Sequence, residues 1–296
     1  MSIDTINSNN QANGLQTIGS QIMNSTNPVK VISITGGKGG VGKSNITLNT
    51  AICLAEMGKK VIIMDADLGL ANIDIMLGLR VTRNLSHVIK GECSLDEILL
   101  EGPNGIKILP ASSGTREMAQ LSEMEHAGLI RAFSELSANV DVLLVDTAAG
   151  IADNVISFAQ ASQDLMVVVC DEPTSITDAY ALIKILSVEH KMHRFRIVAN
   201  MVRSSREGRD LFAKLTRVTD QFLDVTLDYV GSVPFDENVR NAVKKQQALV
   251  KLFPKSEASL AFNHLADKVN GWPIAKTAKG NIEFFMERLV QGGILD

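Results

Sequence analysis

A glycine-rich stretch near the start of the chain carries the residues whose chemistry is easiest to infer. Residues 34–45 read ITGGKGGVGKSN and contain the spacing Gly37-x-x-x-x-Gly42-Lys43-Ser44, which is the pattern of a phosphate-binding loop. Glycine lets the backbone wrap closely around a phosphate, and the N-terminus of the following helix adds unpaired N–H groups and a positive dipole. We expect Lys43 to contact the β- and γ-phosphates of a nucleoside triphosphate and the Ser44 hydroxyl to bind Mg²⁺.

The other loop positions are candidate nucleotide contacts, because the backbone N–H groups of such loops point towards the bound phosphates. Lys38 stands out, since most phosphate loops contain one lysine and this loop contains two. Its position predicts an outward side chain, which is either an idle solvent-facing charge or a contact to the nucleotide of a second subunit. The predicted nucleotide-binding residues of the loop are Gly37, Lys38, Gly39, Gly40, Val41, Gly42, Lys43, Ser44 and Asn45.

Two aspartates end the next strand-like segment, KVIIMDAD, at residues 60–67. This places Asp65 and Asp67 at the carboxyl end of a strand, where open parallel sheets bind their ligands. One interpretation is ordinary turn or helix-capping chemistry, which aspartate favours. The other interpretation is activation of a water molecule beside the γ-phosphate, which makes Asp67 a candidate catalytic residue.

A further aspartate lies in the apolar segment VLLVDTAAG, at residues 142–150. An apolar strand that presents a carboxylate to the hydration shell of Mg²⁺ is the Walker B arrangement, so Asp146 is the predicted carboxylate on the metal side. Gly150 would allow the following segment to move when the γ-phosphate leaves. The order of phosphate loop, D-x-D and apolar strand with D-T-x-x-G is more specific than any of these motifs alone.

The composition limits the classes of protein that need to be considered. Hydrophobic residues make up 45% of the 296 residues and aromatic residues only 4%, which indicates a large aliphatic core. The formal net charge of −4 argues against a surface that binds polyanions throughout. The cysteines lack C-x-x-C spacing, which argues against a disulfide framework or a zinc site. We find no signal peptide and no apolar run of membrane-spanning length, so the expected location is cytoplasmic.

Strand-like and helix-like segments alternate along the chain, which predicts an α/β fold: a doubly wound, mostly parallel sheet with helices on both faces. The predicted strands are residues 29–35, 60–67, 105–110, 140–146, 163–170, 194–200 and 227–234. The predicted helices are residues 43–58, 128–138, 151–161, 176–192, 206–222, 237–251 and 256–270.

No internal repeat or linker divides the chain, so we expect one domain over residues 29–270 with a tail at each end. Residues 1–28 are rich in Asn, Ser, Gln and Thr and have little to bury, which predicts a flexible tail. Residues 271–296 contain an apolar stripe with helical spacing. The stripe consists of Ile282, Phe285, Met286, Leu289 and Val290.

The loop KGGVGKS resembles the deviant Walker A loop of the MinD/ParA (SIMIBI-class) ATPases. Five stretches, TGGKGGVGKSN, DADLGLANIDIMLGL, VDTAAGI, VVCDEPTSITDAYALIK and LFAKLTRVTDQFLDV, together resemble the FlhG/FleN branch, the MinD-like regulators of flagellar number. The resemblance extends from about residue 29 to the C-terminal helix. It implies a slow ATPase that uses Mg²⁺ and alternates between an ATP-bound dimer at the membrane and an ADP-bound or nucleotide-free cytoplasmic monomer.

The resemblance also implies roles for residues at matching motif positions. Lys38 would cross a face-to-face dimer and contact the ATP of the partner, Asp67 would orient the attacking water, and Asn72 would belong to the same switch. The implied metal-side residues are Ser44, Asp65, Asp67 and Asp146, and the implied catalytic residues are Lys38, Lys43 and Asp67. Asn200, Pro234 and Asp236 would surround the adenine base, with ordinary loop residues as the alternative for each.

Several partners are implied by the resemblance alone. The ATP-bound homodimer would associate with the inner face of the cytoplasmic membrane, in some relatives at the cell pole with a landmark protein. It would act with the signal-recognition-type GTPase FlhF, restrain the master flagellar transcription activator and engage C-ring proteins of the flagellar switch complex. No direct contact to nucleic acid is expected.

The two tails resemble the family's terminal segments to different degrees. The family's N-terminal D-Q-A-x-x-L-R segment, which activates FlhF, corresponds here to NQANGLQ at residues 10–16. Gln11, Ala12 and Leu15 fit this pattern, whereas the charged first and last positions do not, so an inert polar tail is the alternative. The family's C-terminal amphipathic helix lies in the membrane interface. The stripe here either does the same, packs on its own domain, or switches between the two states.

Two other functions compete with this interpretation. A ParA-type ATPase that positions DNA or cargo would present a basic surface. Lys/Arg clusters lie at residues 203–217 and 240–251, but Glu207 and Asp210 interrupt the first, and the net charge of the chain is −4. A scaffold that binds nucleotide without hydrolysing it would use the same loop. Retention on DNA and release of phosphate distinguish these alternatives.

Overall fold

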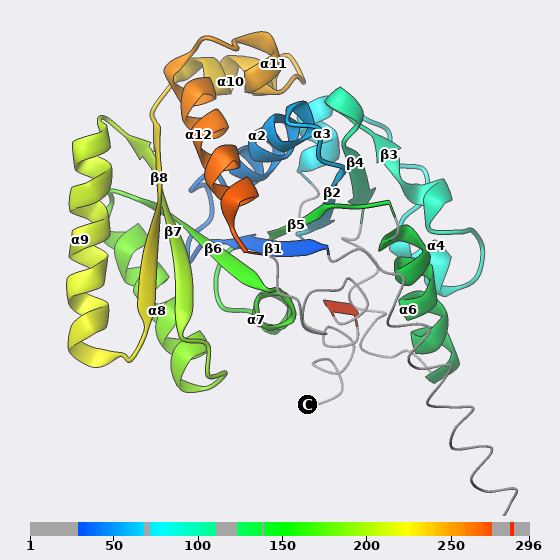
Figure 1. Ribbon diagram of the computed structural model, residues 1–296, viewed down its shortest axis with the longest axis horizontal. Coiled ribbons are helices and arrows are strands. Elements are labelled where there is room, and N and C mark those ends of the chain that lie inside the picture. The colour runs from blue at the N-terminus through cyan, green and yellow to red at the C-terminus, as the bar shows by residue number, and fades with distance from the viewer. Residues whose placement is uncertain (1–28, 68–71, 111–122, 138, 274–284, 287–296) are drawn as a thin grey trace, which may run out of the picture.

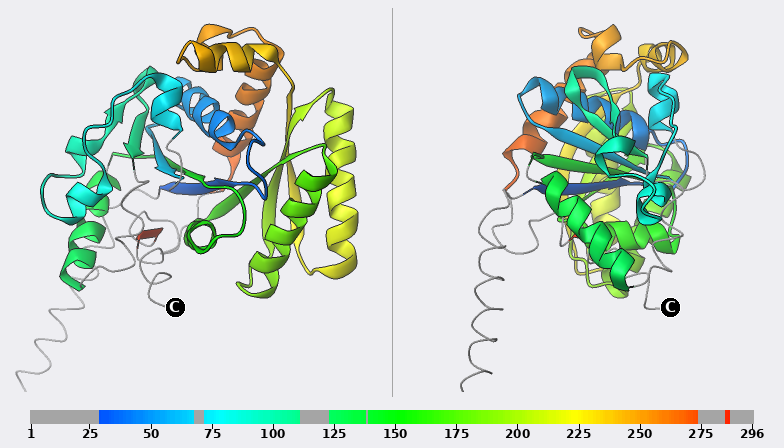
Figure 2. Two further views of the ribbon diagram at one scale, coloured as in Figure 1. Left: turned by 180° about the vertical axis from the view of Figure 1, so that it is seen from behind. Right: turned by 90° about the vertical axis from the view of Figure 1, so that its right-hand side faces the viewer.

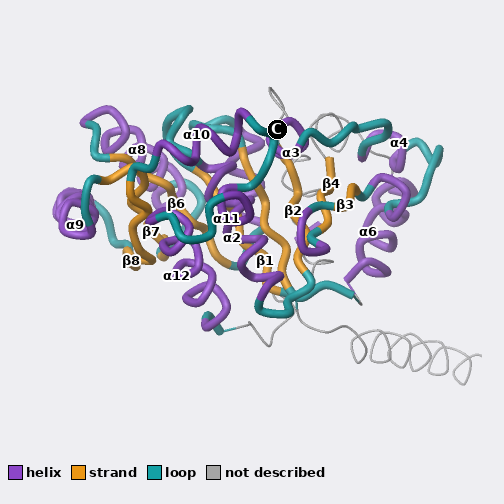
Figure 3. Tube along the Cα trace, turned by 90° about the horizontal axis from the view of Figure 1, so that it is seen from above, coloured by secondary structure: helices purple, strands orange, loops and turns teal. Residues whose placement is uncertain are grey.

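The computed structural model describes residues 29–67, 72–110, 123–137, 139–273 and 285–286. These residues contain one eight-stranded sheet with the strand order β3-β4-β2-β5-β1-β6-β7-β8, which Figure 3 shows from above. Seven strands run parallel, and only β3 pairs antiparallel, with β4. The predicted doubly wound α/β fold is therefore confirmed (Figure 1).

All seven predicted strands are present, and they are the seven parallel ones. β1, β2 and β5 are buried at every position, because a parallel strand with helices on both faces has no side exposed to water. β3 was not predicted, since two residues are too few to show an alternating pattern. The strands are β1 (Lys30–Thr35), β2 (Val61–Ala66), β3 (Leu100–Glu101), β4 (Lys107–Pro110), β5 (Val142–Thr147), β6 (Asp164–Cys170), β7 (Arg194–Val202) and β8 (Thr226–Pro234).

Helices cover both faces of the sheet (Figure 2). The helices are α2 (Lys43–Glu56), α3 (Ile73–Leu77), α4 (Leu85–Ile89), α6 (Glu123–Ser137), α7 (Asp153–Ala161), α8 (Pro173–Val188), α9 (Ser205–Phe222), α10 (Glu237–Lys244), α11 (Leu249–Leu252) and α12 (Glu257–Gly271), with 3₁₀ turns η1 (Asp96–Ile98) and η2 (Pro103–Gly105). α2 and α12 pack on one face, and α6, α7, α8 and α9 pack on the other. Ile32 and Ile34 of β1 therefore face α2, whereas Val31 faces α7.

The single helix predicted over residues 237–251 is wrong. α10 ends at Lys244 and α11 begins at Leu249. Between them, Gln246 adopts a left-handed φ of 53°, which an α-helix cannot continue through. No glycine or proline marks this break, so the apolar spacing of the sequence did not reveal it.

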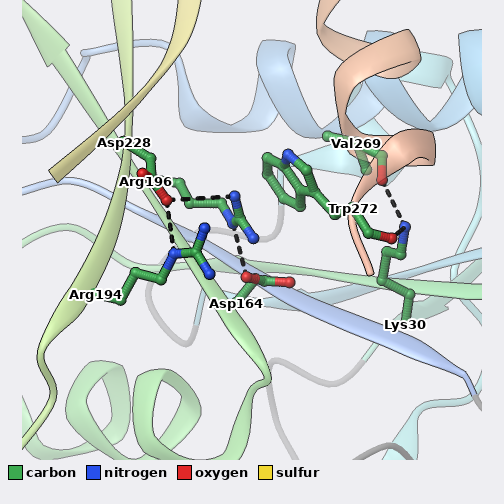
Figure 4. A network of polar contacts seen from close by, with 7 residues as sticks. All are labelled: Lys30, Asp164, Arg194, Arg196, Asp228, Val269 and Trp272. Atoms are coloured by element: carbon green, nitrogen blue, oxygen red, sulfur yellow. Dashed lines mark hydrogen bonds and ion pairs between the residues drawn. The ribbon is translucent and has the colours of Figure 1, made fainter. Parts of the chain in front are cut away.

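A buried polar network fixes the end of α12 (Figure 4). The Lys30 ammonium donates hydrogen bonds to the backbone carbonyls of Val269 at 2.6 Å and Trp272 at 2.8 Å. Arg196 pairs with Asp164 at 2.7 Å, and its guanidinium lies 3.7 Å from the centre of the Trp272 ring, a cation–π distance. The end of α12 is thus held against the start of β1, at the sheet edge opposite the phosphate loop.

Two residues of the predicted C-terminal stripe are described, and both are buried. Phe285 is 1% exposed and Met286 is 0% exposed, and the Phe285 ring centre lies 6.4 Å from that of Phe158 in α7. These side chains thus pack in the core, as in the alternative where the stripe docks on its own domain. None of the helices that the structure describes is both long and apolar enough to cross a bilayer. Ile282, Leu289 and Val290 lie outside the described residues.

Candidate functional site

The phosphate loop and two of the predicted aspartates meet at the carboxyl edge of the sheet. β1, β5 and β2 are neighbours, and the strand register pairs Asp146 of β5 with both Ile34 of β1 and Asp65 of β2. The loop that follows β1 therefore begins beside these two carboxylates. A parallel topology brings them together because it places the C-terminal ends of all its strands at one edge.

The loop glycines have conformations and neighbours that exclude a side chain. Gly40 and Gly42 have left-handed φ values of 81° and 91°, which glycine adopts without a steric penalty. A Cβ atom at Gly37 would lie 2.3 Å from the carbonyl carbon of Asp178, and one at Gly42 would lie 2.3 Å from Nδ2 of Asn200. The close approach of the Asp178 backbone explains glycine at position 37, and the left-handed φ together with the Asn200 side chain explains it at position 42.

Replacing Gly37 with alanine is expected to lower the free energy of unfolding by about 1–3 kcal/mol. The added methyl group would overlap the backbone of Asp178, which cannot rotate away as a side chain would. Gly39→Ala is the matched control, since a Cβ there has nothing within 4 Å, and its effect should stay within about 0.5 kcal/mol. Denaturant unfolding without nucleotide measures both, and equal values for the two variants would contradict the expected clash.

Lys43 is buried at the start of α2, where its ammonium lies close to the acidic groups of the site. Loss of hydration lowers its pKa, while the negative charges of Asp146 and Asp67 act in the opposite direction. A buried cation that is only partly neutralised attracts further negative charge. Lys43 therefore has the environment expected of a side chain that binds phosphate.

Asp146 has one engaged oxygen and one that lacks a partner. Burial raises the pKa of Asp146 to about 7, although a hydrogen bond from Ser44 and the charge of Lys43 lower it. The hydroxyl of Thr47 lies 3.2 Å from Oδ1. Oδ2 is buried without a hydrogen-bond partner among the described residues. Buried polar atoms rarely stay unpaired, so this oxygen is available to a bound ligand.

The unpaired Oδ2 of Asp146 fits a hydrated Mg²⁺ ion, which takes few protein ligands and binds phosphate oxygens together with water. Within the described parts of the chain, no group of three or more His, Cys, Asp or Glu side chains could hold a metal by itself. Ser44 and Asp146 would therefore hold the ion only together with a bound nucleotide. When bound, the ion would neutralise negative charge on the phosphates.

Asp65 holds the segment that follows β2. Its carboxylate accepts hydrogen bonds from the backbone N–H groups of Asp67 at 3.4 Å, Asn72 at 3.0 Å and Ile73 at 3.1 Å. Burial raises its pKa to about 6, although these bonds lower it. The contacts of Asp65 are thus those of the capping interpretation, and its part in the Mg²⁺ shell stays a prediction. Asp67 is half-buried and close enough to Lys43 for their charges to interact.

Lys38 points away from its own loop, and its contacts lie within its own chain. Its ammonium lies 2.8 Å from Oε2 of Glu172 and 3.1 Å from the hydroxyl oxygen of Thr174, both at the start of α8. The hydrogen bond to Glu172 raises the pKa of Lys38. The pair is exposed to solvent, so it is a weak restraint. Contact with a second nucleotide stays a prediction.

A cavity of about 550 Å³ lies beside the loop, between the ends of β7 and β8 and helix α10. Its volume falls in the range of small-molecule sites. All three residues predicted to surround the base line this cavity, together with two loop residues. These are Asn200, Pro234 and Asp236, with Gly42 and Asn45.

Two of these side chains also have contacts within the protein. The Asn200 amide nitrogen donates to the Val41 carbonyl at 2.7 Å, which leaves its oxygen as the atom that could accept from an adenine amino group. Asp236 caps α10 by accepting the Asn238 N–H at 2.8 Å. Both residues thus shape the cavity, and their contacts to a base stay a prediction.

Some cavity-lining residues were not predicted from the sequence. Phe235 is 66% exposed and lies between two residues that were predicted, so its position beside them was an available signal. Met201 has a left-handed φ of 57° at an irregularity in the pairing of β7 with β8, and Arg240 lies on α10. The sequence carries no signal for either, because their place in the cavity depends on how β7 and α10 are arranged.

The residues predicted to contact FlhF, Gln11, Ala12 and Leu15, lie outside the described residues.

Comparison with known proteins identifies the family. A family model described as ParA, NUBPL iron-transfer P-loop NTPase, matches residues 27–270. The chain is 60% identical to the antiactivator FleN of Pseudomonas aeruginosa over 91% of this chain and 96% of that protein. It is 35% identical to the flagellum site-determining protein YlxH of Helicobacter pylori over 95% of this chain and 96% of that protein.

A solved structure shows the same architecture. The septum site-determining protein MinD from Pyrococcus horikoshii, complexed with Mg-ADP, has a TM-score of 0.65 at 26% identity and matches over 82% of this chain and 96% of that chain. The phosphate loop, the strand-end aspartates and the cavity beside them agree with these relationships. The chain therefore belongs to the ParA/MinD family of P-loop NTPases.

Proposed function

We propose that this protein is an ATP-driven switch that regulates the number and placement of flagella. The observation that carries the proposal is a two-lysine phosphate loop, with Asp67 and Asp146 at the same sheet edge, in a chain that is 60% identical to FleN. FleN is named an antiactivator and YlxH a flagellum site-determining protein. The proposal transfers these roles to the present chain.

The chemical step is hydrolysis of ATP to ADP and phosphate. Lys43 stabilises negative charge on the β- and γ-phosphates, and Asp67 orients the attacking water. Ser44 and Asp146 hold Mg²⁺ with the nucleotide. The base enters the cavity beside Asn200. Hydrolysis is slow, because the output of a switch is its conformational state rather than its product.

The ATP-bound state is a homodimer, and ADP or empty chains are monomers. Lys38 leaves Glu172 and contacts the triphosphate of the partner subunit. The exposed ion pair that holds Lys38 in the single chain is weak enough to be replaced by a more highly charged ligand.

The C-terminal stripe alternates between the domain core and the membrane. Phe285 and Met286 are buried against the α6 and α7 layer in the present structure, so they cannot face lipid without leaving it. Dimerisation brings two tails to one surface, which strengthens membrane binding by multivalency.

Deleting residues 281–296 is expected to reduce sedimentation of the ATP-bound protein with anionic phospholipid vesicles at least tenfold, to the level of the ADP state. The deletion removes the apolar stripe but none of the predicted nucleotide-binding residues. ATP binding by the truncated chain is the control for its fold. Equal sedimentation of the truncated and full-length chains would rule out the tail as the anchor.

The proposed partners are FlhF, the flagellar transcription activator, C-ring proteins and, in some settings, a polar landmark protein. The test of the whole proposal is a chromosomal deletion, which should raise the number of flagella per cell and the expression of flagellar genes. Complementation with wild type, but not with Lys43→Ala, should restore both. An unchanged flagellar count, combined with salt-sensitive retention of the ATP state on DNA, would instead favour the DNA-positioning function.

A further inference from the structure

Helix α10 ends in a Schellman motif built on an unusual residue. The N–H of Gln246 donates to the Val243 carbonyl at 3.0 Å, and the N–H of Gln247 donates to the Ala242 carbonyl at 3.1 Å, which are the two bonds of that motif. Gln246 occupies the left-handed position, with a φ of 53°. Glycine or asparagine usually stands there, because a larger side chain is disfavoured. The backbone alone therefore gives no reason for glutamine.

The side chain of Gln246 supplies that reason, because it lies along the end of helix α3. Its amide nitrogen donates to the Ile75 carbonyl at 3.3 Å. Gly78, the C-cap of α3, leaves room for it: a Cβ there would lie 3.0 Å from Oε1 of Gln246 and 3.3 Å from its Cβ. Gln246 thus contacts the C-terminal end of α3 through an exposed hydrogen bond and the packing of its side chain on Gly78.

The N-terminal end of α3 is held by the carboxylate that also holds Asp67. Oδ2 of Asp65 accepts the N–H groups of Asn72 and Ile73, and Oδ1 accepts the N–H of Asp67. A displacement of α3 would therefore act on the Asp65 carboxylate, which also accepts the N–H of Asp67. This path runs entirely through described residues.

The segment that carries Gln246 is attached to the helix that follows the phosphate loop. Buried Asn49 of α2 accepts the Val250 N–H at 3.1 Å and donates to the Asn45 carbonyl at 2.8 Å. This attaches the corner between α10 and α11 to the helix that follows the phosphate loop. α10 itself lines the cavity with Arg240 and Asn241.

We propose that Gln246 is a positioning residue for ATP hydrolysis: it holds α3 and, through Asp65, places Asp67 beside the nucleotide. The proposal rests on the ATPase activity proposed above. Loss of this positioning should lower kcat. ATP binding should not weaken, because Gln246 is absent from the residues that line the cavity.

The test uses two neighbouring glutamines. Gln246→Ala and Gln246→Gly should each lower kcat about three- to tenfold, the effect of losing one hydrogen bond, with KM for ATP unchanged within about twofold. Gln246→Glu keeps the shape but loses the donor, and should show the same fall. Gln247→Ala is the matched control, since both residues are exposed and the Gln247 side chain has no hydrogen bond among the described residues. It should match wild type.

Two measurements separate positioning from general damage to the fold. The unfolding midpoint of Gln246→Gly should equal or exceed that of wild type, because glycine relieves the left-handed strain. Hydrogen exchange of the amides at residues 73–78 should be faster in Gln246→Gly than in wild type or Gln247→Ala, without nucleotide.

A kcat of Gln246→Gly within twofold of wild type, or unchanged exchange at residues 73–78, would overturn the proposal. If wild type releases no phosphate at all, the proposed ATPase activity fails, whereas the exchange measurement still tests the contact.

Discussion

Replacing Asp67 with alanine is expected to slow phosphate release by about 10²–10³-fold, within the range of a lost water-positioning or general-base group. ATP should still bind with nearly wild-type affinity, because Lys43, Ser44 and the base cavity are unchanged. The variant should therefore remain a dimer in ATP long after the wild type has returned to monomers. Single-turnover phosphate release and filter binding of labelled ATP measure the two quantities.

The control for Asp67→Ala is Asp220→Ala. Asp220 is an exposed aspartate on α9, so the same change of charge occurs far from the site, and the rate should stay within twofold of wild type. If Asp67→Ala hydrolyses ATP at the wild-type rate, Asp67 does not position the water. If it loses ATP binding as well, its role is structural and the chemical assignment is wrong.

Replacing Lys38 with alanine is expected to abolish ATP-dependent dimerisation while each chain still binds ATP. Removing one member of a buried pair between an ammonium and a phosphate at an interface weakens association by about 10²-fold or more. Multi-angle light scattering with ATP, with ADP and without nucleotide measures the mass. Wild type should dimerise only with ATP, and Lys38→Ala should remain monomeric in all three.

Glu172→Ala is the informative control for Lys38→Ala. It removes the partner that holds Lys38 within its own chain at 2.8 Å but keeps the lysine. Dimerisation should therefore survive in this variant and be lost only in Lys38→Ala. Equal loss in both variants would mean that the pair within the chain, rather than a contact to the second nucleotide, supports the dimer. If the mass of the wild type is the same with ATP, with ADP and without nucleotide, the proposed ATP-driven switch is wrong.

Much of the candidate site could be predicted because its residues follow directly from local patterns. The glycine spacing identifies the loop, and an aspartate after an apolar run must lie at the ligand edge of a parallel sheet. The register of Asp65 with Asp146 required only that β2 and β5 be neighbours. The helix break at Gln246 was missed because a glutamine, which rarely adopts left-handed φ, gives no signal for it.

By itself, the sequence determined the fold class, the loop and the strand-end aspartates, because periodicity and glycine spacing are local properties that tertiary context does not change. Only the tertiary structure decided which partners these groups have. Lys38 reaches Glu172, 134 positions away, and Asn200 reaches Val41, 159 positions away. The apolar stripe around Phe285 has the same spacing whether it meets lipid or protein. Burial against Phe158 was decided by the packing of α7, because hydrophobic attraction has no direction and sequence periodicity cannot specify its partner.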